Sequence, residues 1–223
     1  MVKSLDAIAG PGARASREPG RRMRSHLLDA ALALFKARGI GGTSVSEIAL
    51  AAGAFPSQVT YYFRTKEALF VEVACREMLY AALQAERAAS RSRTLASYVE
   101  ALVVKAVAAE GLAMFIEALT LARRRQDLAP LIARTVERLH TEGARAYADT
   151  RARRGWPVAD DPAVRARRFW ALALGVVLRD AAMGTATADS TKEILELLRD
   201  EWHVPPAAAA RRPRLMAVRA SSR

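Results

Sequence analysis

The segment Thr43–Lys66, TSVSEIALAAGAFPSQVTYYFRTK, decides the fold of this chain, because it predicts two short helices joined by a tight turn. The sequence SVSE at 44–47 has the spacing of a capping box, in which Ser44 and Glu47 each accept a backbone hydrogen bond from the other residue. Gly53 supplies the positive φ that a tight turn between two crossed helices commonly requires. The segment is therefore a candidate helix-turn-helix.

The second helix of this segment presents a polar and aromatic outer face. Pro56 fits its first turn, where a missing N–H is no loss, and Val59 and Phe63 face inward one helical turn apart. The outward side chains are those of Ser57, Gln58, Thr60, Tyr61 and Tyr62. Their hydroxyl, amide and aromatic groups suit the phosphate oxygens, base edges and thymine methyls of a DNA major groove. The alternative is that the two tyrosines only pack within a small helical subdomain.

The sequence around this segment predicts an all-α fold. Apolar residues recur at three- and four-residue spacing, and abundant Ala, Leu and Arg with few aromatic residues favour helices over strands. The expected helices span residues 21–38, 44–52, 56–63, 65–90, 94–109, 112–125, 128–154, 161–183 and 190–202.

The formal net charge of +12 is concentrated at the two ends of the chain. Residues 1–24 hold six Lys and Arg against two acids, and residues 205–223 hold five Arg and no acid. We expect residues 1–20 to form a disordered basic arm and residues 205–223 a disordered basic tail. Such ends suggest a polyanionic partner, with nucleic acid as the first candidate. The alternative is that they only keep the protein soluble.

The cysteine content and the apolar runs indicate a soluble cytoplasmic protein without a membrane partner. Cys75 is the single cysteine, which excludes an intrachain disulfide, and we expect an inert core residue rather than a redox sensor. The N-terminus lacks the apolar segment of a signal peptide. The longest apolar run, Phe169–Leu178, is about half as long as a membrane-spanning helix requires.

The residue patterns of enzymes and metal sites do not occur in this sequence. The three histidines, His26, His140 and His203, lack metal-ligand spacing, and there is no glycine-rich phosphate loop or cysteine cluster. We therefore predict that the protein is not an enzyme, with no catalytic residue, bound metal or cofactor.

Six short motifs follow one another in the order of a known DNA-binding domain. They are the apolar residues 28–35, Thr-Ser-Val at 43–45, Ile-Ala at 48–49, Gly53, the aromatic run 61–63 and Lys-Glu-Ala-Leu at 66–69. With these motifs, residues 24–71 resemble the DNA-binding domain of the TetR family of bacterial transcriptional regulators. Two positions depart from the family pattern. Phe55 stands where a small polar helix cap is common, and Thr60 where a tyrosine is common.

The resemblance implies specific roles for residues of this segment. Thr43 and Ser44 match positions that meet the phosphate backbone or cap the second helix. Lys66 matches a lysine that grips a phosphate, and Arg64 beside it would add charge. Together with the outward face described above, the predicted DNA-binding residues are Thr43, Ser44, Ser46, Pro56, Ser57, Gln58, Thr60, Tyr61, Tyr62, Arg64 and Lys66.

The resemblance divides the chain into a DNA-binding domain at residues 21–66 and a larger helical regulatory and dimerisation domain at residues 67–204. The apolar run 169–178 and the apolar stripe of the last helix resemble half of a symmetric four-helix dimer interface, and the family places its interface there. The alternative is that both helices complete the core of a single chain. The interface candidates are Phe169, Val176, Val177, Ile194, Leu195, Leu198 and Trp202.

A ligand cavity in the larger domain is the usual switch of the family. The residues that we expect to line it are Met114, Phe115, Glu117, Tyr147 and Trp170, although apolar spacing alone does not distinguish a filled core from a hollow one.

These features predict a homodimeric, ligand-responsive transcriptional regulator, most simply a repressor that a small-molecule effector releases from a palindromic double-stranded DNA operator. The alternative function is that of a helical binding or scaffold protein whose basic ends contact nucleic acid non-specifically.

Overall fold

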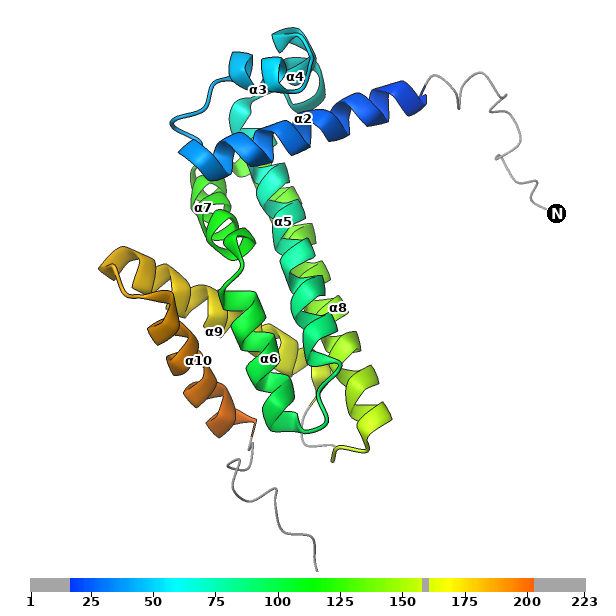
Figure 1. Cartoon of the computed structure of the whole chain (residues 1–223), viewed down its shortest axis with the longest axis vertical. Helices are drawn as coiled ribbons and strands as arrows, with labels where there is room; N and C mark the ends of the chain where they lie inside the picture. Colours follow the sequence, from blue (N-terminus) through cyan, green and yellow to red (C-terminus); the bar gives the residue numbers. More distant parts are fainter. Residues whose placement is uncertain (1–16, 158–160, 203–223) are drawn as a thin grey trace, which may run out of the picture. The chain divides into compact units, whose positions relative to one another are not determined.

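The computed structural model describes residues 17–157 and 161–202, and within them all regular secondary structure is helical (Figure 1). The all-α class is thus confirmed. The elements are α2 (Arg17–Arg38), α3 (Val45–Ala51), α4 (Pro56–Phe63), α5 (Lys66–Ala89), α6 (Leu95–Val107), α7 (Glu110–Arg124), the 3₁₀ turn η1 (Gln126–Leu128), α8 (Ala129–Arg154), α9 (Pro162–Met183) and α10 (Thr187–Glu201).

Helix α2 begins at Arg17, four residues before the expected start near Arg21. Pro19 and Gly20 lie in its first turn, where backbone N–H groups have no partner within the helix, so proline is tolerated. The predicted arm therefore loses its last four residues to α2. The rest of that arm, residues 1–16, and the predicted tail at 205–223 lie outside the described residues, as does His203.

The chain divides into two compact units, which are described separately. The first contains the described residues up to Tyr80 together with Glu110–Glu137, and the second contains Ala81–Ala109 and the described residues from Arg138 onward. The expected functional division between residues 66 and 67 stays a prediction, because these units follow packing rather than function.

In the first unit, α3 packs against both α2 and α4. The capping box at the start of α3 is confirmed, since Ser44 accepts from the Glu47 backbone and Glu47 accepts from the Ser44 backbone. Gly53 has a φ of 64° in the turn between α3 and α4, which a side chain would strain. The buried apolar residues that hold these helices together include Leu27, Ala31, Ile48, Ala49, Val59, Phe63 and Leu69.

Helix α7 belongs to the same unit and packs closely against α5. A Cβ atom at Gly111 would lie 2.7 Å from the Glu77 carbonyl oxygen, so only glycine permits this approach. The Lys36 ammonium lies 2.9 Å from a Glu110 carboxylate oxygen and joins α2 to the start of α7.

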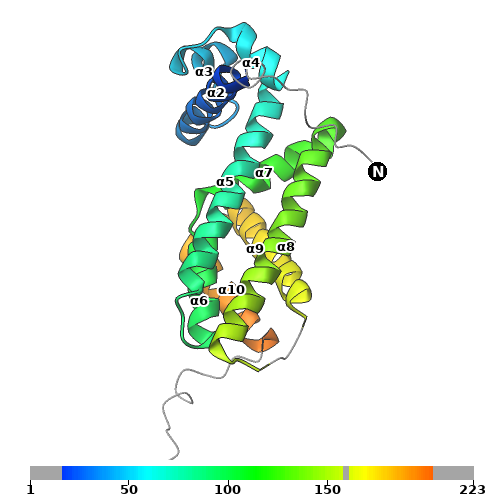
Figure 2. The ribbon, with the colours of Figure 1, turned by 90° about the vertical axis from the view of Figure 1, so that its right-hand side faces the viewer.

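In the second unit, α10 packs against α6 and α9 (Figures 1 and 2). A buried polar contact fixes the turn between α9 and α10, where the Ser190 hydroxyl donates to the Asp180 carboxylate at 2.6 Å. This hydrogen bond and a second one from Arg179 lower the pKa of Asp180. The α9–α10 hairpin is thus held by polar as well as apolar contacts.

No helix among the described residues is long and apolar enough to cross a membrane. Charged residues flank the apolar run of α9, with Arg168 directly before it and Arg179 directly after it.

Candidate nucleic-acid interface and internal cavity

Helix α4 exposes the polar and aromatic side that its sequence predicts. Val59 and Phe63 are buried, whereas Ser57, Thr60 and Tyr61 are exposed, with Tyr61 at 80%. We call these three exposed residues the recognition face. The outward position of a tyrosine and two hydroxyls on a short, anchored helix suits contacts to base edges and phosphates.

The start of α4 has no side-chain cap hydrogen bond at Phe55, the position that departs from the family pattern. Phe55 is the N-cap residue and is 75% exposed. Gln58 compensates, because its side-chain oxygen accepts a hydrogen bond from the Phe55 backbone N–H at 3.0 Å. Gln58 is half-buried, and its side-chain oxygen already accepts a hydrogen bond that fixes the helix start.

The first turn of α2 lies beside α4. A Cβ atom at Gly20 would be 3.4 Å from the Tyr62 hydroxyl, so the start of α2, which carries Arg21, lies next to Tyr62 of α4. Tyr62 is half-buried and makes an edge contact with Tyr61 at 5.0 Å between ring centroids. Arg21 is exposed and forms no ion pair among the described residues. Sequence reasoning missed Arg21, although a run of arginines at a helix start was a signal for it.

The turn between α4 and α5 is a γ-turn centred on Arg64. Its φ and ψ are 66° and −53°, and the Thr65 N–H donates to the Phe63 carbonyl at 2.8 Å. This conformation is rare and strained for a residue with a side chain. The Arg64 side chain is exposed and has no ion-pair partner in the described chain, so it remains available for a phosphate.

Lys66 occupies a different environment from the predicted one. Its ammonium donates to the carbonyl oxygens of Ile40 at 2.7 Å and Thr43 at 2.8 Å, and the residue is half-buried. These carbonyls belong to the loop between α2 and α3. Lys66 therefore stabilises the loop that carries the start of α3, and in this geometry its charge is directed to the protein rather than outward.

Thr43 also has a structural role. It is only 2% exposed, and its hydroxyl donates to the Gly39 carbonyl at 2.9 Å. The predicted phosphate contact through this hydroxyl does not fit, because the group is buried and already bonded. The spacing of sequence motifs could not reveal this, since it gives a position and not the direction of a side chain.

The start of α3 leaves Ser44 and Ser46 exposed. The Ser44 side chain, its backbone N–H and the Arg38 guanidinium lower the pKa of Glu47 to about 2. Glu47 is thus a fixed negative charge next to Ser44. Leu50 of the same helix is 82% exposed, and sequence reasoning did not single it out.

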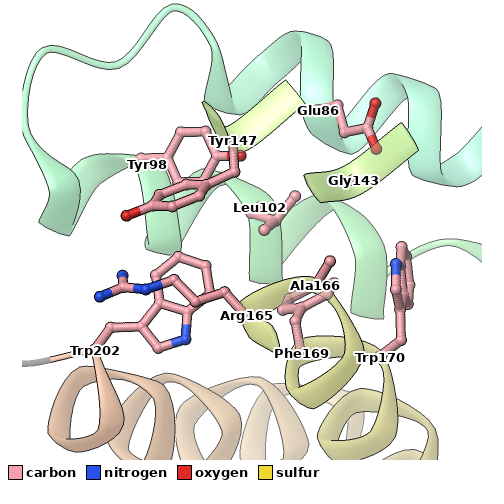
Figure 3. A pocket seen from close by; sticks show the side chains of 10 residues that line it. All are labelled: Glu86, Tyr98, Leu102, Gly143, Tyr147, Arg165, Ala166, Phe169, Trp170 and Trp202. Carbon is pink, nitrogen blue, oxygen red and sulfur yellow. The ribbon is translucent and has the colours of Figure 1, made fainter. Parts of the chain in front are cut away.

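The second unit contains a cavity at the contact of α5, α6, α8 and α9 with the end of α10 (Figure 3). The space between these side chains is about 330 Å³ when the open solvent at its mouth is included, and the enclosed part is much smaller. The lining residues are Glu86, Tyr98, Leu102, Gly143, Tyr147, Arg165, Ala166, Phe169, Trp170 and Trp202. The lining is mostly apolar with a few polar groups, which is the chemical make-up of small-molecule sites.

Two of the five predicted pocket residues, Tyr147 and Trp170, line this cavity. The other three were wrong as lining residues, because Met114, Phe115 and Glu117 lie on α7 in the first unit, where Phe115 is fully buried and Glu117 is exposed.

The polar groups of the cavity lie apart from one another. Figure 3 shows Glu86 and Trp170 at one end of the lining and the Arg165 guanidinium, with Trp202, at the other. Burial, followed by repulsion from Glu142, raises the pKa of Glu86 to about 7. Arg165 is buried and stacks over the Trp202 ring at 4.7 Å from its centroid.

The predicted dimer residues are mostly buried within their own unit. Phe169, Val176, Ile194, Leu198 and Trp202 are each less than 9% exposed, while Val177 and Leu195 are half-buried. The first five therefore pack in the core of their own unit, as in the alternative interpretation, and the predicted interface stays a prediction. Sequence periodicity does not distinguish these two kinds of burial.

Comparisons with known proteins agree with the geometry of the first unit. A sequence model described as bacterial regulatory proteins of the tetR family matches residues 27–73, and one described as the C-terminal part of a bacterial transcriptional repressor matches residues 95–199. The HTH-type transcriptional regulator AcrR of Shigella flexneri is 39% identical over 61 residues, which cover 27% of this chain and only 28% of AcrR.

Solved structures extend the likeness over most of the chain. A protein described as a transcriptional regulator from Rhodococcus sp. RHA1 is 35% identical, with a TM-score of 0.72 over 82% of this chain and 96% of that one. A protein described as a TetR-family regulator from Mesorhizobium loti MAFF303099 shares the fold, with 22% identity and a TM-score of 0.62 over 82% of this chain and 98% of that one.

An all-α chain with an anchored helix-turn-helix and a second helical unit defines a DNA-binding transcriptional regulator. The chain belongs to the TetR family of bacterial transcriptional regulators.

Proposed function

We propose that this regulator is a homodimeric repressor that binds a palindromic operator and leaves it when a small-molecule effector occupies the cavity of the second unit. The observation that carries the DNA-binding part is the recognition face of α4. Val59 and Phe63 anchor this helix while Ser57, Thr60 and Tyr61 point away from the unit.

Two exposed basic residues lie near α4 in the chain or in space. Arg64 directly follows the end of α4, and Arg21 follows Gly20, which lies next to Tyr62 of α4. Such arginines suit phosphate contacts, which position a protein on DNA, whereas the side chains of α4 suit contacts to bases, which give specificity. We therefore assign the sequence preference to Tyr61 and its neighbours, and the general affinity to Arg21 and Arg64.

A nuclease protection assay on the DNA flanking the protein's own gene tests this assignment. We expect a footprint that weakens as salt increases, and that Tyr61→Ala abolishes its sequence preference. Tyr80→Ala is the matched control, because Tyr80 is also an exposed tyrosine of the first unit but lies on α5. A protein that protects no specific sequence, or a Tyr61→Ala variant that retains the preference, contradicts the proposal and favours a scaffold with non-specific nucleic-acid contacts.

The dimer surface that we propose lies on the exposed side of α9. Ala171, Gly175, Leu178 and Ala182 are exposed and follow one another at spacings of four, three and four residues. Small residues in one stripe let the backbone of a second helix approach closely, and a dimer would remove the half-exposed Leu178 from water. Two copies would then present two recognition faces to half-sites about 34 to 36 Å apart or a multiple of that distance.

The proposed effector site is the cavity of the second unit. Its five aromatic residues, together with Glu86 and Arg165, offer a small molecule both apolar surface and polar contacts. The repressor assignment is supported by the sequence model that matches residues 95–199, which is described as the C-terminal part of a bacterial transcriptional repressor. An effector that binds the released state more tightly would weaken operator binding by a coupling free energy of about 1 to 3 kcal/mol.

A further inference from the structure

Half of the cavity lining is aromatic. They are Tyr98 of α6, Tyr147 of α8, Phe169 and Trp170 of α9, and Trp202, which directly follows α10. Their rings contact one another in pairs, at 5.8 Å between Tyr98 and Tyr147 and 4.8 Å between Phe169 and Trp170. Aromatic faces carry partial negative charge, and rings gathered around one space are a setting in which proteins bind organic cations.

A carboxylate completes one end of this aromatic site. No hydrogen bond or ion pair from the described residues reaches the Glu86 side chain, although it lines the cavity. A half-buried carboxylate without a partner carries a desolvation cost, and a positive group beside it relieves that cost.

Gly143 of α8 opens the space next to this carboxylate. A Cβ atom at Gly143 would lie 3.7 Å from the Glu86 Oε1 atom and 3.8 Å from the Trp170 Nε1 atom. The carboxylate and the indole therefore border the same gap at Gly143, which is about as wide as one methyl group. A positive group there would contact both the carboxylate and an aromatic ring.

The single cation of the lining is placed elsewhere. Arg165 stacks over the rings of Tyr147, at 5.2 Å, and Trp202, at 4.7 Å. Figure 3 shows its guanidinium directed away from Glu86 and Trp170. This end of the cavity already uses its aromatic faces for a positive charge, and the Glu86 end does not.

We propose that the effector of this regulator is an organic cation, whose charged nitrogen lies beside Glu86, Gly143 and Trp170 and whose apolar part lies against the other aromatic residues. The regulatory role of this ligand rests on the proposed function, whereas binding of the ligand can be measured without DNA.

The experiment measures binding to the full-length protein without DNA, by quenching of tryptophan fluorescence. The readout is direct, because Trp170 and Trp202 are two of the three tryptophans in the chain and both line the cavity. The probes are phenyltrimethylammonium, its uncharged isostere tert-butylbenzene, and benzoate. We expect the cation to bind at least about tenfold more tightly than the isostere, as for a charge paired in a partly buried site.

Three variants locate the interaction. Glu86→Gln should remove the preference for the cation and leave binding of the isostere unchanged, whereas Glu100→Gln, an exposed acid of α6, should change neither. Gly143→Ala should weaken cation binding several-fold without unfolding the protein, because the added methyl meets only ordinary contacts of 3.6 to 3.8 Å and alanine favours the helix.

The pH gives an independent readout. Cation affinity should rise between about pH 6 and pH 8 as Glu86 loses its proton, while isostere affinity stays constant. The titratable groups near Glu86 are Tyr98 on α6 and Glu142 and Tyr147 on α8, whereas the Arg165 guanidinium on α9 is directed away from it. Burial raises the pKa of Tyr98, so it stays neutral over this range.

Preferential binding of benzoate, a cation preference that survives Glu86→Gln, or no binding of any probe at millimolar concentration overturns the proposal. If the cation binds as expected but operator binding is absent or unaffected, the ligand class stands and the proposed regulatory function fails.

Discussion

The ammonium group of Lys66 lies 2.8 Å from the backbone carbonyl oxygen of Thr43 and directs its charge into the loop between α2 and α3. With the second bond to Ile40, the lysine links the start of α5 to a segment more than twenty residues earlier in the chain. The family resemblance implies a phosphate contact for Lys66, whereas in this structure the residue positions the loop that carries Ser44.

Replacement of this lysine by methionine should destabilise the first unit. Lys66→Met leaves two carbonyl groups without their charged donor, and we expect the free energy of unfolding to fall by about 1 to 3 kcal/mol. Chemical denaturation measures this change, with Lys105→Met, an exposed lysine of α6, as the control that should change stability by less than about 0.5 kcal/mol. A variant of wild-type stability that binds all DNA more weakly would instead support a direct phosphate contact.

The γ-turn at Arg64 predicts a variant that is more stable and binds DNA less well. Arg64→Gly removes the side chain from a backbone conformation with a φ of 66°, which glycine adopts without strain. We expect a gain of about 1 kcal/mol in the free energy of unfolding. Arg64→Ala loses the same charge but keeps the strained φ, so it should show the loss of DNA affinity without the gain in stability. If the two variants are equally stable, the positive φ at residue 64 does not strain a residue with a side chain.

Arg21 should contribute to affinity for DNA of any sequence. Arg21→Ala is expected to weaken binding to operator and unrelated DNA by the same factor. It should also reduce the slope of log K against log salt concentration by about 1, since one phosphate contact is lost. Titrations at several salt concentrations measure both quantities, and Arg145→Ala, an exposed arginine of α8, is the control. A loss confined to the operator would mean that Arg21 contacts bases.

Glu86 predicts a pH-dependent stability. Its pKa is raised from an ordinary value near 4.5 to about 7, so the folded state holds a proton that the unfolded state has released between these pH values. The contribution of the neutral carboxyl is complete below about pH 4.5 and is lost as the pH rises through 7. We therefore expect Glu86→Gln to gain about 1 to 2 kcal/mol over the wild type between pH 5 and pH 8, after allowance for solvent screening.

Thermal or urea unfolding of the two proteins at pH 5 and pH 8 measures this difference. The control is Glu100→Gln, which replaces an exposed acid of the same unit and should follow the wild type at both values. A constant difference between Glu86→Gln and the wild type would show that the carboxyl is already charged at pH 5.

The exposed stripe of α9 predicts where the dimer can be broken. Leu178 is 50% exposed in the single chain, and Leu178→Arg would place a charge in the proposed interface. We expect sedimentation to change from dimer to monomer with little change in helix content. Val104→Arg alters an apolar residue of α6 that is 41% exposed, and it should stay dimeric. If the Leu178→Arg variant remains dimeric, the dimer interface lies on another surface.

Local sequence patterns sufficed for the helices of this fold. The capping box at Ser44, the turn at Gly53 and the proline at the start of α4 each act within a few residues, so their geometry follows from spacing alone. The exposed position of Tyr61 follows in the same way, because Val59 and Phe63 fix which side of α4 is buried.

Long-range contacts account for the predictions that did not hold. The lining of the cavity combines residues from Glu86 to Trp202, and no local pattern records that α7 lies in the other unit. Ile194 and Leu198 show the same limit, since an apolar stripe is identical whether its partner belongs to the same chain or to a second copy. The roles of Lys66 and Thr43 depend on carbonyl groups that sequence does not position.

Only Arg64 and Thr65 separate α4 from α5, and the hydrogen bond between Phe63 and Thr65 closes that turn. A connection this short restricts movement of α4 relative to α5. The hydrogen bond from Lys66 to the Thr43 carbonyl also fixes the start of α5 to the loop before α3. The first turn of α5 and helix α4 should consequently rotate as one lever. If that part of α5 tilts by a small angle, Tyr61 rotates by the same angle. Operator affinity can therefore respond to a tilt of a few degrees without any rearrangement within α4.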